Sequence, residues 1–256
     1  MPRAFRIVQR NALVFLRMWR GSVVVTLLTP TLYLASMGFG VGALVDRGSA
    51  VLPGGVSYLT FLGPGLLAAT CMQTAASESS WPINGKMLWH RNYDAIAGTP
   101  MRVVDIVLGE LTWIAVRLLM ISVVYVIVLA AFGAVRSFAL LAAIPAALLT
   151  GLGVSGPILA YAATLKRGQN FNVLQRFIVM PLFLFSGTFF PITRLPIGLQ
   201  YLATVTPLYH GVELTRGIAL QTLTWSAGLV HAGFLAALCA AGCAVAVWTF
   251  SRRLYV

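Results

Sequence analysis

Charged side chains fall inside or at the edges of long apolar segments of this sequence: Glu78, Glu110, Arg117 and Glu213. Burying a charge in a lipid bilayer is costly, so such residues are usually paired or serve a function. Glu110 and Arg117 are about 10 Å apart along one predicted helix, too far for a direct bond. We therefore expect Arg117 to find a partner on another helix or in a water-filled cavity. Glu78 should either cap a following helix or contact a neighbouring charge. For all of these residues we expect structural pairing rather than substrate contact.

A serine and a histidine raise the possibility of a nucleophile with its base. Residues 153–156 (GVSG) lie in one apolar segment and His231 begins another, as in rhomboid intramembrane proteases. Runs of small residues are also common where membrane helices pack closely. Ser155 would lie mid-membrane, whereas His231 would lie near the outer end of its span. An intramembrane protease is therefore kept as an alternative, which would lose its activity on Ser155→Ala.

Other catalytic signatures are missing from the sequence. It contains no glycine-rich phosphate loop with its lysine, and its three histidines lack metal-ligand spacing. We therefore predict that this chain binds no cofactor or metal and is not an enzyme. The cysteines are interpreted as small packing residues of apolar segments: Cys71, Cys239 and Cys243.

The composition is that of a membrane protein. Hydrophobic residues make up 59% of the 256 residues and charged residues only 9%, with a mean hydropathy of +0.88. Soluble domains carry about a quarter charged residues. The net charge of +12 comes from basic residues that flank apolar segments, where they orient a chain in the bilayer. A nucleic-acid partner is therefore not expected.

We predict an all-α polytopic membrane protein that forms a single domain over residues 1–256. Six membrane spans are expected, at residues 21–44, 56–77, 106–132, 138–165, 171–190 and 227–250. Residues 1–20 are predicted to form an amphipathic helix at the membrane interface. Its basic face is made of Arg3, Arg6, Arg10, Arg17 and Arg20.

Sorting the basic residues predicts the orientation. If the N-terminus is cytoplasmic, most of the arginines and lysines gather on the cytoplasmic side of the six spans. The sequence therefore predicts a multi-pass protein of a bacterial cytoplasmic (inner) membrane, with both termini cytoplasmic.

Two connecting segments are more patterned than simple loops. Residues 81–105 form a polar cytoplasmic elbow with a Gly-Thr-Pro turn signal. From these residues alone, a docking surface for another protein and a plain positively charged inside loop are equally open. Residues 191–224 are too apolar for an exposed loop and too rich in proline for a full span. They are expected to form a re-entrant helical hairpin on the outer side.

With these segments placed, the sequence resembles the type-2 ABC exporter permease family, nearest its nodulation-factor (lipo-oligosaccharide) and daunorubicin-type drug export branch. The resemblance covers nearly the whole chain. It is carried by residues 61–67 (FLGPGLL), 91–100 (RNYDAIAGTP), 105–111 (DIVLGEL), 185–191 (FSGTFFP) and 206–216 (TPLYHGVELTR). One departure is residues 79–82 (SSWP), where the family has more apolar or glycine-rich residues and where we expect a helix break.

The resemblance implies a permease subunit of an ATP-driven exporter that moves an amphipathic drug, lipid or lipo-oligosaccharide outward. It implies a separate ABC ATP-binding subunit that holds ATP and Mg²⁺, and a second permease subunit, identical or a sister chain, among membrane lipids. The elbow would be the coupling helix of the permease. The residues expected to dock the ATPase are Arg91, Tyr93, Asp94, Ala95, Ile96, Thr99, Pro100 and Arg102.

An ATP-independent carrier is the remaining alternative. Such carriers are expected to show acidic residues near mid-membrane for a coupling ion and a detectable internal repeat. The acidic residues here lie mostly toward the ends of the predicted spans, and the two halves show no repeat.

Overall fold

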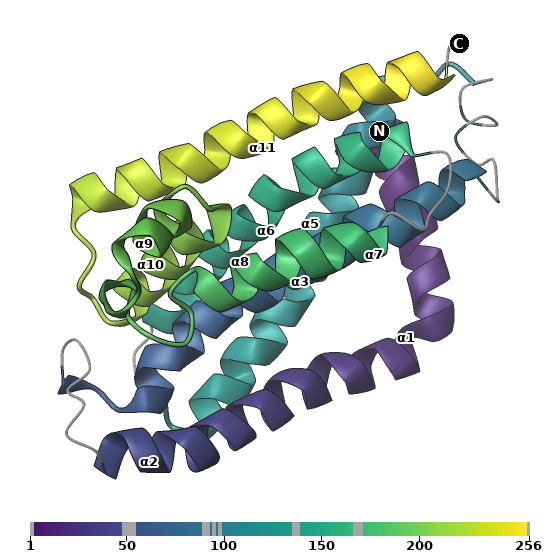
Figure 1. The fold of residues 1–256 in the computed structure, drawn as a ribbon. Coiled ribbons are helices and arrows are strands. Elements are labelled where there is room, and N and C mark those ends of the chain that lie inside the picture. The colour runs from purple at the N-terminus through teal and green to yellow at the C-terminus, as the bar shows by residue number, and fades with distance from the viewer. Residues whose placement is uncertain are drawn as a thin grey trace.

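The computed structural model describes residues 3–47, 55–88, 93, 96, 99–134, 139–165 and 171–254. Over these residues the chain is a bundle of helices without a β-strand, as the all-α prediction requires (Figure 1). The two termini lie at the same end of the bundle.

The elements follow one another along the chain with these bounds: α1 (Arg3–Ala35), the π-helix η1 (Ser36–Val41), α2 (Gly42–Arg47), α3 (Tyr58–Leu88), α5 (Val103–Ala131), α6 (Ala139–Thr164), α7 (Phe171–Leu174), the π-helix η4 (Gln175–Val179), α8 (Met180–Phe185), the 3-10 helix η5 (Ile192–Arg194), α9 (Ile197–Thr204), α10 (Pro207–Ala219) and α11 (Trp225–Leu254).

Within the described residues, five helical segments are long and apolar enough to cross a membrane. They are Leu28–Val45, Tyr58–Leu88, Val103–Ala131, Ala139–Thr164 and Trp225–Leu254. The predicted span at 171–190 corresponds instead to a shorter apolar helix, Phe171–Phe185, which is below the roughly 20 residues that a straight crossing needs. The residues at 191–224 form the short helices η5, α9 and α10.

The predicted interface helix and the start of the first span lie on one element in the structure. Residues 3–35 form one continuous helix, α1, which changes direction along its length (Figure 1). Gly109 of α5 allows the start of α1 to pack closely, because a Cβ there would lie 2.8 Å from the Cβ of Ile7. The arginine-rich segment is therefore held against the bundle by backbone-level packing.

The helix break expected at residues 79–82 is not present. α3 continues to Leu88 with Pro82 inside it. Ser79, Ser80 and Ile83 around the proline are buried, so packing against the rest of the bundle maintains the helix. A helix held by tertiary contacts tolerates a local breaker because most helical stability in proteins comes from packing.

α6 lies at the centre of the bundle and meets α11 through glycines. A Cβ on Gly156 would lie 2.9 Å from the Cα of Gly242, and one on Gly242 would lie 2.4 Å from Cδ of Pro157. Small residues allow two membrane helices to approach at backbone distance. The last carbonyls of α6 are capped from two other helices, since Asn84 Nδ2 and Arg253 Nη1 both donate to the Leu165 oxygen.

Adding a methyl group at this helix crossing should destabilise the fold. The Cβ of Gly242→Ala would lie 2.4 Å from Cδ of Pro157. Overpacking of this kind lowers the free energy of unfolding by about 1–3 kcal/mol. Gly233→Ala on the same helix is the control, since no atom lies within 4 Å of its added Cβ. We expect thermal challenge in detergent, followed by size-exclusion chromatography, to show a lower midpoint for Gly242→Ala only. Equal midpoints for the two variants would contradict this packing.

Candidate functional site

The buried carboxylate of Glu110 is the centre of the candidate site. It lies two turns into α5, whose first turn is closed by the Arg102 backbone N–H donating to Asp105 Oδ2 at 3.0 Å. Only 1% of Glu110 is exposed. A carboxylate in such a place is stable only when opposite charge and hydrogen-bond donors replace water.

Three different parts of the chain supply those donors. Lys86 Nζ of α3 lies 2.7 and 2.8 Å from the two carboxylate oxygens. Asn11 Nδ2 of α1 donates to Oε2 at 2.9 Å, and the Tyr93 hydroxyl donates to Oε1 at 2.8 Å. Glu110 therefore joins α1, α3, α5 and the segment between α3 and α5 at one point.

Tyr93 faces the interior of the bundle. Its side chain is fully buried and its ring meets Phe250 of α11 edge-on, with centroids 5.8 Å apart. Burial raises the pKa of the Tyr93 phenol well above its usual value, and the neighbouring Glu110 raises it further. The hydroxyl thus stays protonated and donates its hydrogen bond. The structure makes Tyr93 an internal anchor of this segment, whereas the sequence suggested a surface contact.

The other described residues of the predicted docking segment differ in their exposure. Ile96 is partly buried, and its carbonyl accepts the Thr99 hydroxyl at 2.6 Å. Thr99, Pro100 and Arg102 are exposed. Arg3 of α1 donates to the carbonyl of Pro100, so the N-terminus reaches this segment as well. Three other predicted docking residues lie outside the described residues: Arg91, Asp94 and Ala95.

The arginines of residues 1–20 do not all share one environment. Arg10 is partly buried, and its positive charge acts on the Tyr93 phenol. The others are exposed: Arg3, Arg6, Arg17 and Arg20. The first half of α1 therefore presents a positively charged surface beside the Tyr93 anchor.

A second ion pair lies deeper along α3 and α5. Arg117 Nε is 3.1 Å from Glu78 Oε1, so each residue finds its partner on the neighbouring helix. The Arg117 guanidinium also lies over the ring of Phe15, 4.4 Å from its centroid. Of the two roles considered for Glu78, the structure shows the charge contact.

A cavity of about 880 Å³ opens next to both ion pairs. It is lined by α1, α3, α5, η4 and α8, with Lys86, Glu110, Glu78 and Arg117 in its wall. Cavities that hold a small molecule are typically of this size.

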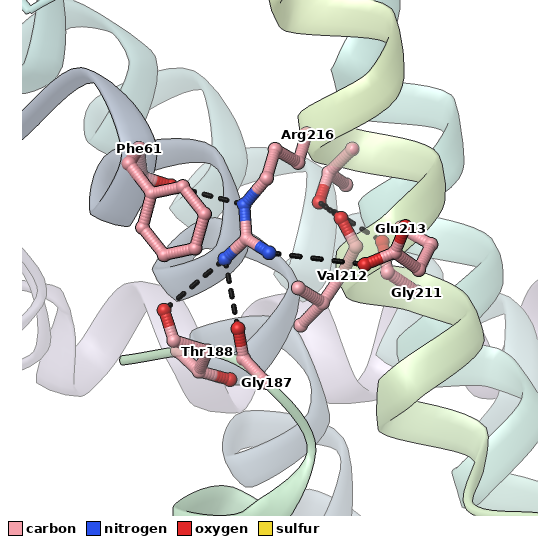
Figure 2. A network of polar contacts seen from close by, with 8 residues as sticks. Phe61, Gly187, Thr188, Gly211, Val212, Glu213 and Arg216 are labelled. Carbon is pink, nitrogen blue, oxygen red and sulfur yellow. Dashed lines mark hydrogen bonds and ion pairs between the residues drawn. The ribbon is translucent and has the colours of Figure 1, made fainter. Parts of the chain in front are cut away.

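At the far end of α3, Arg216 of α10 is buried among backbone carbonyls (Figure 2). Its Nε donates to the Phe61 oxygen at 3.1 Å, and its Nη2 donates to Gly187 and Thr188 at 2.9 and 3.2 Å. The guanidinium lies 3.8 Å from the Phe61 ring centroid. Glu213, which is 40% exposed, is a looser partner at 3.8 Å. Arg216 thus ties α10 to α3 and to the chain after α8.

The geometry does not assemble a serine protease site. The Ser155 hydroxyl donates to the carbonyl of Gly151 in its own helix at 3.0 Å. His231 Nδ1 lies 2.8 Å from His210 Nδ1 instead. In addition, the described residues contain no group of three or more His, Cys, Asp or Glu side chains that could hold a metal ion.

Comparison with known proteins identifies the family. The family model described as ABC-2 type transporter matches residues 3–220. The chain belongs to the ABC-2 type transporter family. It is therefore a permease, a multi-pass membrane subunit that transports rather than catalyses.

Curated relatives of this permease share a single name. Nodulation protein J of Rhizobium leguminosarum bv. trifolii is 33% identical over 212 residues, 83% of this chain and 79% of that protein. Nodulation protein J of Rhizobium meliloti (strain 1021) is 31% identical, over 90% of this chain and 85% of its own length. Nodulation protein J of Bradyrhizobium diazoefficiens is 30% identical, over 96% and 92%.

The sequence did not indicate several residues of the permease that make buried polar contacts in the structure. Lys86 and Asn11 were not recognised as partners of Glu110, because they are far from it in the chain. Arg216 was not singled out as a buried charge, although only 8% of the residue is exposed. Its place between two apolar turns of a short helix was the available signal.

Removing the cation from the Glu110 site should destabilise the permease. Lys86→Met leaves a carboxylate that is 1% exposed without its counter-charge, and breaking such a pair costs about 3–5 kcal/mol. Lys86→Met combined with Glu110→Gln should regain most of the loss, because no charge is then left unpaired. The thermal midpoint of the detergent-purified protein is the measurement. A single variant as stable as the wild type, or a double variant that is less stable than the single, would contradict this account.

Proposed function

We propose that this chain is the permease subunit of an ATP-driven exporter. A separate ABC ATP-binding subunit, which carries ATP and Mg²⁺, docks on the segment 81–105 and on the arginines of α1. A second permease subunit, identical or a sister chain, completes the pathway. The cargo is an amphipathic drug, lipid or lipo-oligosaccharide that leaves the cytoplasm or the inner leaflet.

The observation that carries this proposal is the attachment of Tyr93 to Glu110. A segment moved by a partner transmits that movement only if it is fixed to the membrane helices. Here the segment is fixed by a hydrogen bond of 2.8 Å to a carboxylate that also holds Lys86 of α3 and Asn11 of α1. A displacement of the segment therefore acts on three helices at once, which suits a transporter driven from outside its own chain.

The proposal also assigns a place in the membrane. Both termini and the segment 81–105 are cytoplasmic, and α9 and α10 re-enter the outer leaflet against the surrounding lipids. Residues 171–190 form a sixth crossing, in which the apolar helix Phe171–Phe185 is extended by the residues that follow it. Two features support this arrangement. The termini lie at one end of the bundle (Figure 1), and most of the basic residues are on the side predicted to be cytoplasmic.

Loss of the Tyr93 hydroxyl should uncouple the exporter. Tyr93→Phe keeps the ring against Phe250 but removes the bond to Glu110. We expect cargo-stimulated ATP hydrolysis by the reconstituted complex to fall at least about fivefold, equivalent to about 1 kcal/mol, the net value of one hydrogen bond. Tyr201→Phe is the matched control, because Tyr201 is 70% exposed on α9.

Complex assembly should be retained in both variants, as measured by co-purification of the ATPase. Full coupling in Tyr93→Phe would refute the transmission role of this residue. If the purified chain exported solute without any ATPase, the proposed function itself would fail.

The orientation can be measured with membrane-impermeant thiol reagents. In a background with the three native cysteines replaced by alanine, Arg6→Cys and Thr193→Cys each place one thiol at an exposed position. Position 6 should be labelled only in inside-out vesicles and position 193 only in right-side-out vesicles or cells. The reverse pattern would overturn the proposed topology and with it the docking of a cytoplasmic ATPase.

A further inference from the structure

One face of α3 presents a stripe of polar side chains to the cavity. Thr70, Gln73, Thr74, Ser77 and Glu78 all line it, and their spacing of three and four residues places them on one side of a helix. A polar stripe in a membrane helix is unfavourable in contact with lipid. Its position in the cavity wall therefore calls for a polar occupant.

The middle of this stripe is free to make hydrogen bonds. Thr70 donates to Leu66 of its own helix at 2.7 Å, and Glu78 is paired with Arg117. For Gln73, Thr74 and Ser77, the part of the chain that the structure describes supplies no hydrogen-bond partner for the side chain. The amide of Gln73 and the two hydroxyls can each donate and accept, which suits an occupant that carries both kinds of group.

The wall across from α3 has a different chemistry. α1 contributes apolar and aromatic side chains together with a few polar ones, and α8 adds an aromatic ring. The apolar and aromatic residues are Val14, Phe15, Met18, Pro30, Tyr33 and Phe183, and the polar residues of α1 are Asn11, Thr26 and Thr29. The cavity is thus amphipathic, with a polar stripe along α3 and a larger share of hydrocarbon and rings along α1 and α8.

The charges in the cavity wall cancel in pairs. Lys86 lies 2.7 Å from Glu110, and Arg117 lies 3.1 Å from Glu78. Charged side chains of the wall are therefore already matched within the protein. A cationic drug or an anionic lipid head would have to break one of these pairs, which leaves a charge without its partner.

We propose that this cavity binds a non-ionic amphiphile whose head carries several hydroxyl or amide groups. The head bonds Gln73, Thr74 and Ser77, and the apolar chain lies along α1. This inference rests on the proposed export function and deepens it, because it assigns a cargo class and the residues that select the head. Selection is by hydrogen bonding rather than by charge.

Direct binding tests the proposal without the ATPase. The full chain in lipid nanodiscs is titrated with tritiated dodecyl maltoside below its micelle concentration, and separately with labelled dodecylphosphocholine, whose chain has the same length but whose head is zwitterionic. Empty nanodiscs give the partition background. We expect saturable binding of the maltoside and only background binding of the phosphocholine.

The stripe is tested with Gln73→Leu combined with Thr74→Val, which removes its hydrogen bonds at similar volume. We expect maltoside affinity to fall at least about tenfold, or about 1.4 kcal/mol. Thr112→Val on α5 is the matched control, since Thr112 is exposed outside the cavity and, among the described residues, its hydroxyl donates only to the Leu108 carbonyl of its own helix. Gln73→Asn with Thr74→Ser should retain most of the binding, which separates loss of hydrogen bonds from misfolding.

The outcomes distinguish this site from the export function. Equal binding of the two probes, or undiminished maltoside binding by Gln73→Leu/Thr74→Val, would overturn the proposed site even if ATP-driven export is intact. Saturable, stripe-dependent binding by a chain whose Tyr93→Phe variant stays fully coupled would support the site while the coupling account fails.

Discussion

The relative positions of α1, α3 and α5 depend most on the burial of one carboxylate. Glu110 is withdrawn from water on α5, and its charge is tolerable only while Lys86, Asn11 and Tyr93 surround it. These partners come from three segments that are distant in sequence, so meeting this single electrostatic requirement fixes the relative positions of α1, α3 and α5. Tyr93, in the polar segment before α5, is held by the same requirement, since its hydroxyl is one of the donors to Glu110.

The opposite end of the bundle is held by a guanidinium rather than a carboxylate. Arg216 carries a charge with only a loose acidic partner and is satisfied mainly by three backbone carbonyls and the face of Phe61. Gly187 and Thr188 follow the last residue of α8, so their carbonyls lie outside the helical hydrogen-bond ladder and accept from Arg216 instead. The cavity lies along α3 between these two polar clusters, and its own polar stripe belongs to the same helix.

Much of the architecture follows from the sequence because hydropathy and charge act locally. Long apolar runs predicted the all-α bundle and the approximate places of its helices. The predicted helix break after Glu78 was wrong. The Trp-Pro pair is a local signal, and it is overridden because Ser79, Ser80 and Ile83 are buried against the rest of the bundle. The interface helix at residues 1–20 stays a prediction, whereas the close approach of α1 to Gly109 is a new finding, because it cannot be recognised before both helices are placed.

The sequence was sufficient to recognise the charged residues of the candidate site but not the residues with which they pair. Glu78, Glu110 and Arg117 stand out as charges in apolar surroundings, and the expectation that they pair is what the geometry shows. Which residues pair depends on how helices cross, which spacing along one helix does not reveal. Tyr93 is an example: it occurs in a polar stretch of the sequence, yet its side chain is fully buried in the fold.

α3 reaches both polar clusters without interruption. Phe61 near its beginning accepts from Arg216, and Lys86 near its end holds Glu110. At 1.5 Å per residue these two points are about 37 Å apart. One continuous helix thus joins the two polar clusters, and its hydrogen-bond ladder lacks a backbone N–H only at Pro64 and Pro82, one near each cluster, so the helix between them is uninterrupted by proline.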